Sequence, residues 1–305
     1  MKTKLLTIVL AIFYFQSFAQ TLNESQRFWD YSDTLNKKKL FGVTGVQAGI
    51  IAVTWIALNE AWYVDYPRQS FHVYNDNAGW LHMDKFGHAM SSYYIGFSSM
   101  EFYRWAGVDH RKRLLVGAPM GLIYLTGIEI MDGHSEGWGF SWGDMLANTT
   151  GSVILIGQEL LWKEQKMVLK VSSHLSPYAN YRPDLMGSVW YERLLKDYNG
   201  QTYWLSMNVN SLTGWDKWPE WLNLAVGYGA DGMISSNYNK KIYENSDSFK
   251  WQKQYYVALD LDLRKLPVKS PFLKGVFNLI NFIKVPMPTI EFNQKGSPNY
   301  HILYF

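Results

Sequence analysis

The chain has 305 residues, with 29 lysines and arginines against 26 aspartates and glutamates, and a formal net charge of +3. Without residues 1–20, which hold two of the lysines, 27 basic residues face 26 acidic ones and the net charge falls to +1. So balanced a charge gives no general affinity for polyanions, and we expect no nucleic-acid partner. The chain has no cysteine, so we expect no disulfide bond, no thiolate metal site and no lipid on a mature N-terminal cysteine.

Residues 1–20 have the pattern of a secretory signal peptide. Lys2 and Lys4 precede an almost wholly apolar run over residues 5–15, and Ser17 and Ala19 are small. The run is too short to cross a bilayer comfortably, so we expect cleavage near Ala19 or Gln20. The chain is therefore expected to be exported, to the periplasm or outer membrane of a Gram-negative bacterium.

Residues 21–40 are polar and predict a lead-in segment, and residues 41–170 predict a helical domain. Four helices are expected there, over residues 41–59, 84–105, 111–130 and 142–162, the third with a kink at Pro119. The first contains no charged residue and is long enough to span a bilayer. Gly117 and Gly121 permit close helix approach in water or in lipid. A soluble bundle and a membrane-associated one both remain open, and we favour membrane association.

Residues 171–305 predict a strand-rich domain. Apolar residues alternate with polar or small ones over residues 203–212, 221–230 and 254–264, which predicts one antiparallel sheet. The apolar face either packs on the helices or faces lipid as a barrel wall. About five strands are expected, fewer than the eight of the smallest such barrels, which favours a sheet packed on helices. The predicted fold class is α+β, with a four-helix N-terminal bundle followed by an antiparallel strand-rich domain.

Polar side chains concentrate at the predicted helix ends between residues 84 and 151. In an up-and-down bundle, four segments would bring six candidate residues to one end: Glu60, Asp84, His88, Glu129, Asp132 and Asp144. The helix dipole disfavours acids at a helix C-terminus, where Glu129 and Asp132 are expected. They need a cation, a shared proton or a hydrogen-bond donor. Lys85, Ser141, Asn148 and Glu60 are expected to support the cluster.

Two chemistries fit this cluster. Asp84, His88, Glu129 and Asp144 could hold a divalent metal, since carboxylates suit Mg²⁺, Mn²⁺ or Ca²⁺ and an imidazole admits Zn²⁺. Alternatively, the acids and the histidine could carry out acid–base hydrolysis. Structural interpretations compete with both, because Ser141 and Asp144 also fit a helix capping box.

The polar residues also resemble a known family. The motifs that carry the likeness are Asp84-Lys85-x-x-His88, Glu129-x-x-Asp132 and Ser141-x-x-Asp144-x-x-x-Asn148-x-x-Gly151. In order and spacing these resemble the YfiM-like predicted periplasmic lipoproteins, an uncharacterised family, and more faintly the VanZ-like membrane proteins. The likeness covers about residues 40–165. It implies an envelope location and a shared polar site, and it implies no activity.

Two functional hypotheses follow. The first is an exported cell-envelope protein that associates with the membrane and binds lipid or an envelope protein. The second is a hydrolase or transferase that acts on a lipid or cell-wall substrate through the Asp/His/Glu cluster, with or without a metal. The sequence does not decide whether the protein is an enzyme.

Overall fold

The computed structural model describes residues 31–64, 66–236, 249–294 and 296–305. The expected signal peptide over residues 1–20, and the lead-in as far as residue 30, lie outside them. In the N-terminal part the helices are α3 (Lys37–Leu58), α4 (Met83–Trp105), α5 (His110–Val116), α6 (Met120–Gly133) and α7 (Trp142–Trp162). Further on, strands β1 (Met167–Ser173), β2 (Gln201–Asn208), β3 (Leu222–Asp231), β4 (Gln252–Leu261), β5 (Met287–Asn293) and β6 (Asn299–Tyr304) alternate with the short helices α8 (Pro183–Met186), α9 (Trp190–Lys196), α10 (Val209–Thr213) and α11 (Pro271–Ile280). The α+β class, with helices first and strands after, is confirmed.

The expected count of four N-terminal helices is wrong. The third expected helix is two helices, because Pro119 occupies the N-cap position of α6 and has no N–H to donate to the preceding turn. The first helix starts at Lys37 rather than at residue 41. The side chain of Asn36 accepts hydrogen bonds there from the backbone N–H groups of Lys38 and Lys39.

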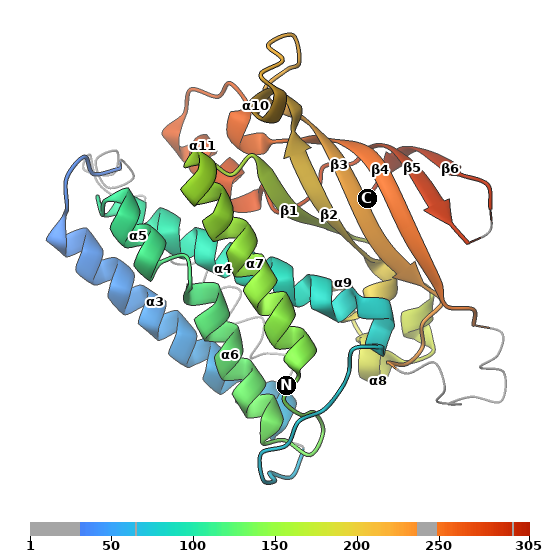
Figure 1. Cartoon of the computed structure of the whole chain (residues 1–305). Coiled ribbons are helices and arrows are strands. Elements are labelled where there is room, and N and C mark those ends of the chain that lie inside the picture. The colour runs from blue at the N-terminus through green and yellow to red at the C-terminus, as the bar shows by residue number, and fades with distance from the viewer. Residues whose placement is uncertain (1–30, 65, 237–248, 295) are drawn as a thin grey trace.

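Helix α4 is the element against which the other long helices pack. It lies across α6 and α7, and its first turns reach the sheet (Figure 1). Glycines make the crossings close. A Cβ atom on Gly121 would lie 1.9 Å from the Ser92 carbonyl oxygen, and one on Gly151 would lie 2.0 Å from that of Ala89. Close backbone contact therefore fixes where α6 and α7 cross α4.

Two helical stretches are long and apolar enough to cross a bilayer, judged by length and composition alone. These are α3 and the run His110–Gly133. In the structure only 6% of the apolar window of α3 is buried, against 33% for the second stretch. Helix α3 therefore lies on the outside of the bundle and exposes a largely apolar surface that includes Phe41 and Ile56.

The six strands form one antiparallel sheet in chain order, β1 to β6, as Figure 1 shows. The expected pairing of the segments around residues 203–212, 221–230 and 254–264 is confirmed, as β2–β3–β4. The sheet is curled. Tyr304 of β6 reaches across to Thr202 of β2, with 3.2 Å between their hydroxyl oxygens, and Val171 of β1 forms a parallel bridge with Ile283, just before β5.

The buried face of this curled sheet is the polar one. Lys170 and Asp260 form an ion pair of 2.7 Å on that face, and both side chains are fully buried. Ser206 donates a hydrogen bond to the same aspartate. The apolar face packs on the helices only in part. Neither of the two expectations from the sequence, a face packed on helices or a barrel wall facing lipid, therefore describes the whole sheet.

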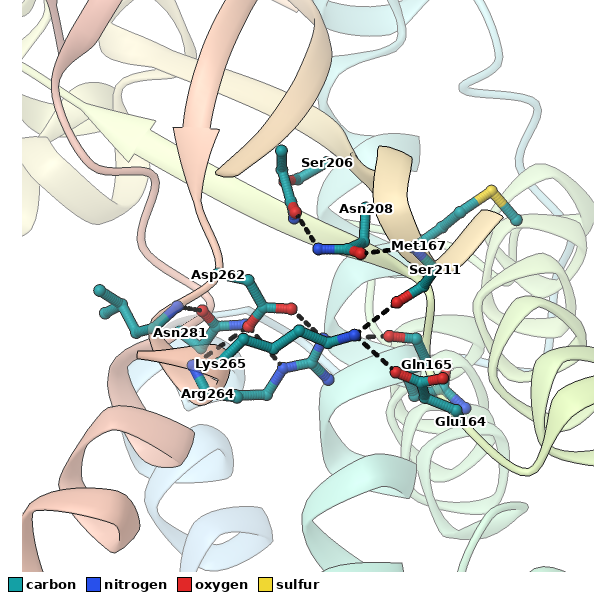
Figure 2. A network of polar contacts seen from close by, with 12 residues as sticks. Glu164, Gln165, Met167, Ser206, Asn208, Ser211, Asp262, Arg264, Lys265 and Asn281 are labelled. Carbon is teal, nitrogen blue, oxygen red and sulfur yellow. Dashed lines mark hydrogen bonds and ion pairs between the residues drawn. The ribbon is translucent and has the colours of Figure 1, made fainter. Parts of the chain in front are cut away.

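Polar contacts tie the end of α7 to the sheet. Figure 2 shows Lys265 in contact with Glu164 and Ser211, and Arg264 paired with Asp262. Arg264 also donates a hydrogen bond of 3.0 Å to the backbone oxygen of Gln165. These contacts attach the helical part to the sheet at the end of α7 opposite the residues described next.

Candidate functional site

Lys85, in the first turn of α4, lies among three aspartates. Its Nζ is 2.7 Å from Asp76, 2.9 Å from Asp84 and 2.9 Å from Asp144. Burial alone would lower the pKa of Lys85, but its contacts with Asp144 and Asp76 outweigh burial and raise that pKa. The ammonium group is therefore a built-in cation that neutralises one of three neighbouring carboxylates.

His88 lies one turn further along α4 and faces α7. Its Nδ1 is 3.1 Å from the Asn148 amide oxygen, and its Nε2 is 3.6 Å from Asp144 Oδ1. Because the amide oxygen can only accept, Nδ1 carries the proton in the neutral ring and Nε2 keeps its lone pair. The ring is thus held with one nitrogen free to act as a base or as a ligand.

Glu129 of α6 closes the site from the other side. Its side chain is 1% exposed, its Oε2 accepts a hydrogen bond from the backbone N–H of Ser141, and its Oε1 has no hydrogen-bond partner. Oε1 lies 3.8 Å from His88 Nδ1. Burial, together with the neighbouring carboxylates of Asp144 and Asp132, raises the pKa of Glu129 to about 8, although the hydrogen bond from the Ser141 N–H acts in the opposite direction.

Three further buried atoms in this cluster have no hydrogen-bond partner in the described structure, Asp84 Oδ1, Asp144 Oδ1 and Asn148 Nδ2, although Asp144 Oδ1 lies 2.9 Å from Lys85 Nζ. A buried polar group without a partner costs about 1–3 kcal/mol. Four such atoms within one cluster indicate a site arranged for something other than its own internal bonds.

Asp144 and Asp76 are held by the start of α7. Ser141 caps this helix, accepting from the Asp144 backbone N–H at 3.1 Å, so the expected capping contact is present. The same hydroxyl donates to Asp76 Oδ1 at 2.6 Å. Burial raises the pKa of Asp144. For Asp76 burial acts in the same direction, but hydrogen bonds from Lys85 and Ser141 outweigh it and hold the pKa below its usual range.

Asp76 was missed in the sequence because helix periodicity says nothing about the loop before α4. The chain reaches α4 through three consecutive residues with positive φ, Trp80, Leu81 and His82, at 47°, 50° and 71°. Non-glycine residues adopt this conformation at a cost of about 1–2 kcal/mol each. The sheet holds the turn, since the Tyr228 hydroxyl donates to the Leu81 carbonyl oxygen at 2.6 Å.

Asp132 and Glu60 lie apart from the centre of the cluster. The Tyr63 hydroxyl donates to Asp132 at 2.6 Å, and burial raises the pKa of Asp132 to about 6. Glu60 is exposed, because α3 continues into a π-helical turn over Asn59–Tyr63. The end of α3 does lie near the end of α6, since Tyr63 bonds to Asp132, but among the described residues Glu60 itself has no hydrogen bond or ion pair to the cluster.

Two groups of three side chains have the spacing of a metal site. His88, Glu129 and Asp144 each offer a ligand atom, and these atoms lie within 4.8 Å of one another. Asp76, Asp84 and Asp144 form a second such group, but the Lys85 ammonium already lies among its carboxylates. The first group is therefore the better candidate for an ion.

A surface cavity of about 360 Å³ lies beside the cluster, between the π-helical turn and the end of α6. Tyr63 lines this cavity and also bonds to Asp132. Ile130 and Met131 form its apolar wall. The volume is in the range of small-molecule sites, and Tyr63 connects it to the acidic residues.

Residues 73–156 match the family model described as "Predicted periplasmic lipoprotein (DUF2279)". The matched stretch contains the whole cluster from Asp76 to Asn148, and it supports an exported, periplasmic or envelope location. The chain supplies no cysteine for lipid attachment. No curated protein and no solved structure gave a match. The finer likenesses to YfiM-like and VanZ-like proteins stay predictions.

Proposed function

We propose that this envelope protein binds a divalent cation through His88, Glu129 and Asp144 and uses it to hydrolyse a lipid or cell-wall substrate. The observation that carries the proposal is Glu129 Oε1. This atom is buried and has no hydrogen-bond partner, and Glu129 offers a ligand atom within 4.8 Å of ligand atoms on His88 and Asp144. A buried carboxyl oxygen without a donor is explained if it faces an ion.

The charges around the site support a cation. Asp76, Asp84 and Asp144 place three carboxylates around one ammonium group. The excess of negative charge next to His88 favours a second positive charge. One imidazole with carboxylate oxygens suits Zn²⁺ or Mn²⁺.

Each side chain has a role under this proposal. Asn148 orients His88 by accepting from its Nδ1, as outer partners of metal-binding histidines do. Three protein ligands leave a coordination position in which a bound ion would lower the pKa of water. Lys85, 2.9 Å from Asp144, would hold that carboxylate in position.

A second candidate function has its own observation. Helix α3 exposes Phe41 at 83% and Ile56 at 65%, which supports a membrane-associated factor that binds lipid without catalysis. In that case the cluster would be a structural network. The two candidates differ in what replacement of Glu129 does.

The test is equilibrium binding of Zn²⁺ and Mn²⁺ to the full chain and to Glu129→Gln, which has the shape of the protonated acid. The matched control is Glu136→Gln, an exposed acid in the adjacent turn. The proposal predicts one tightly bound ion per chain, and a loss of at least about tenfold in affinity for Glu129→Gln alone. Hydrolysis of phospholipids and peptidoglycan fragments, assayed in parallel, should be lost in the same variant.

Equal binding by the wild type and Glu129→Gln would contradict the proposal. A structural network predicts a different pattern, with no ion bound by either protein and a lower melting temperature for the variant.

A further inference from the structure

Most outward positions of strands β1 to β5 carry apolar side chains. Neighbouring side chains on this face form rows across the strands, set by the observed register. One row is aromatic and consists of Tyr203, Tyr228, Tyr255 and Phe292. The next row is aliphatic and consists of Leu169, Leu205, Val226, Val257 and Ile290.

The polar residues of the same strands point to the inner face of the sheet, where they are buried. Lys170, Asp260 and Asn223 are fully buried there. Trp204 donates from its ring nitrogen to Ser172 at 3.0 Å. The polar residues of the strands therefore form their hydrogen bonds inside the curled sheet, and the apolar residues point outward. In a sheet with one face in water, the apolar residues point inward instead.

Helices cover only one part of the outer face. Phe86 of α4 stacks on Tyr203 and Tyr228, and Leu169 packs against the core around Tyr93. Further across the sheet, no helix of the described part of the chain covers this face. Val226 is 41% exposed, Tyr255 52%, Val257 37% and Phe292 46%.

The uncovered region has the layout of a surface that faces lipid. Between residues 222 and 228 of β3, and between 255 and 261 of β4, the outward positions carry no charged side chain. At one end of the aliphatic band lie Tyr255 and Phe292, the uncovered members of the aromatic row, and Trp221, 38% exposed, precedes β3 at the other end. Aromatic residues at both edges of an apolar band are typical of strands at a bilayer.

We propose that the uncovered outer face of β3, β4 and β5 contacts the apolar layer of a lipid bilayer. A second protein chain would also cover apolar side chains, but a bilayer accounts in addition for aromatic residues at both edges of the band. Tyrosine and tryptophan fit the boundary between hydrocarbon and water, because one end of each ring system is apolar and the other polar. This inference concerns the sheet and does not depend on the ion site.

The absence of cysteine from the chain allows a direct test. Val257→Cys in the full chain carries a polarity-sensitive fluorophore, and the matched control is Leu195→Cys on α9, where the side chain is 72% exposed. Vesicles of equimolar phosphatidylethanolamine and phosphatidylglycerol should shift the emission of the Val257 probe to the blue. Brominated lipid chains should quench it, and the Leu195 probe should respond to neither.

A second variant tests the energetics without a label. Val257→Lys places a charge at the centre of the band and should lower vesicle affinity about tenfold or more, whereas Leu195→Lys should not. If Val257→Cys fails to fold, Phe292→Cys reports on the same face. An unchanged Val257 probe with vesicles overturns the proposal. A blue shift that follows protein concentration without lipid also overturns it, in favour of a second copy of the chain.

Discussion

In the cluster at the end of the bundle, the ammonium group of Lys85 lies among three carboxylates that have the spacing of a metal site. Lys85 is 14% exposed and within 2.9 Å of three carboxylates. A buried charge is tolerated when it is paired on several sides. The ammonium lies among Asp76, Asp84 and Asp144 and leaves His88 and Glu129 as the side of the cluster without a lysine.

A second buried lysine makes a prediction about pH. Lys284 is fully buried, stacks over Trp204 at 4.6 Å, and donates only to the Val285 carbonyl oxygen in the described structure. Burial lowers its pKa from 10.5 to about 8. Between these two values the unfolded chain holds a proton that the folded chain has released, so stability should rise with pH across that window.

Lys284→Met removes this titration and keeps most of the volume. We expect the variant to be more stable than the wild type at neutral pH, by roughly 1–3 kcal/mol, with the difference shrinking as pH rises from 8 towards 10.5. Asp260 keeps its partners Lys170 and Ser206, so no charge is orphaned. Urea unfolding at several pH values measures both proteins, and parallel pH profiles would show that the wild-type lysine stays charged.

At the scale of elements, the helix crossings depend on glycines. In Gly121→Ala the added Cβ would lie 1.9 Å from the Ser92 carbonyl oxygen, so α6 must move away from α4. We expect a loss of about 1–3 kcal/mol in the free energy of unfolding, as for other overpacked sites. Since α6 carries Glu129, the same change should also weaken binding at the cluster.

Gly157 provides the control for this prediction. It lies in α7, and a Cβ there would meet nothing within 4 Å. Gly157→Ala should raise stability by about 0.5–1 kcal/mol, the ordinary preference of a helix for alanine. Thermal unfolding of the two variants separates the steric clash at Gly121 from the general preference of a helix for alanine. Equal changes in melting temperature would contradict the claim that α6 and α4 approach too closely for a side chain at Gly121.

The elements with a clear period were predictable from the sequence. Helix α7 has the expected bounds, 142–162, because Ser141 caps it and its apolar positions repeat regularly. The paired strands β2, β3 and β4 follow from their alternation. Which face of the sheet is buried was not predictable, because alternation alone does not tell whether Leu259 or Asp260 points inward.

The residues of the site were predictable where they lie on helices. Asp84, His88, Glu129 and Asp144 come together because three helix ends meet. Glu60 does not, since a π-helical turn follows α3. The position of Asp76 could not be predicted from the sequence, because it depends on a left-handed turn that Tyr228 of the sheet holds in place.

At the scale of the whole molecule, helices and sheet share a feature. The polar groups of the sheet are buried inside its curl, those of the cluster lie between helix ends, and apolar side chains are exposed on both α3 and β4. This arrangement is consistent with the envelope location that the family match supports. The sheet also stabilises the site directly, through the Tyr228 contact and the stacking of Phe86.

The central claim is that His88, Glu129 and Asp144 hold a divalent cation. The most direct test is X-ray diffraction from crystals of the full chain grown with Zn²⁺ or Mn²⁺, recorded above and below the absorption edge of the metal. We predict one strong anomalous peak between His88 Nε2 and the carboxylates of Glu129 and Asp144, absent in Glu129→Gln crystals. Crystals that show no peak there, or a peak that persists in Glu129→Gln, would contradict the account.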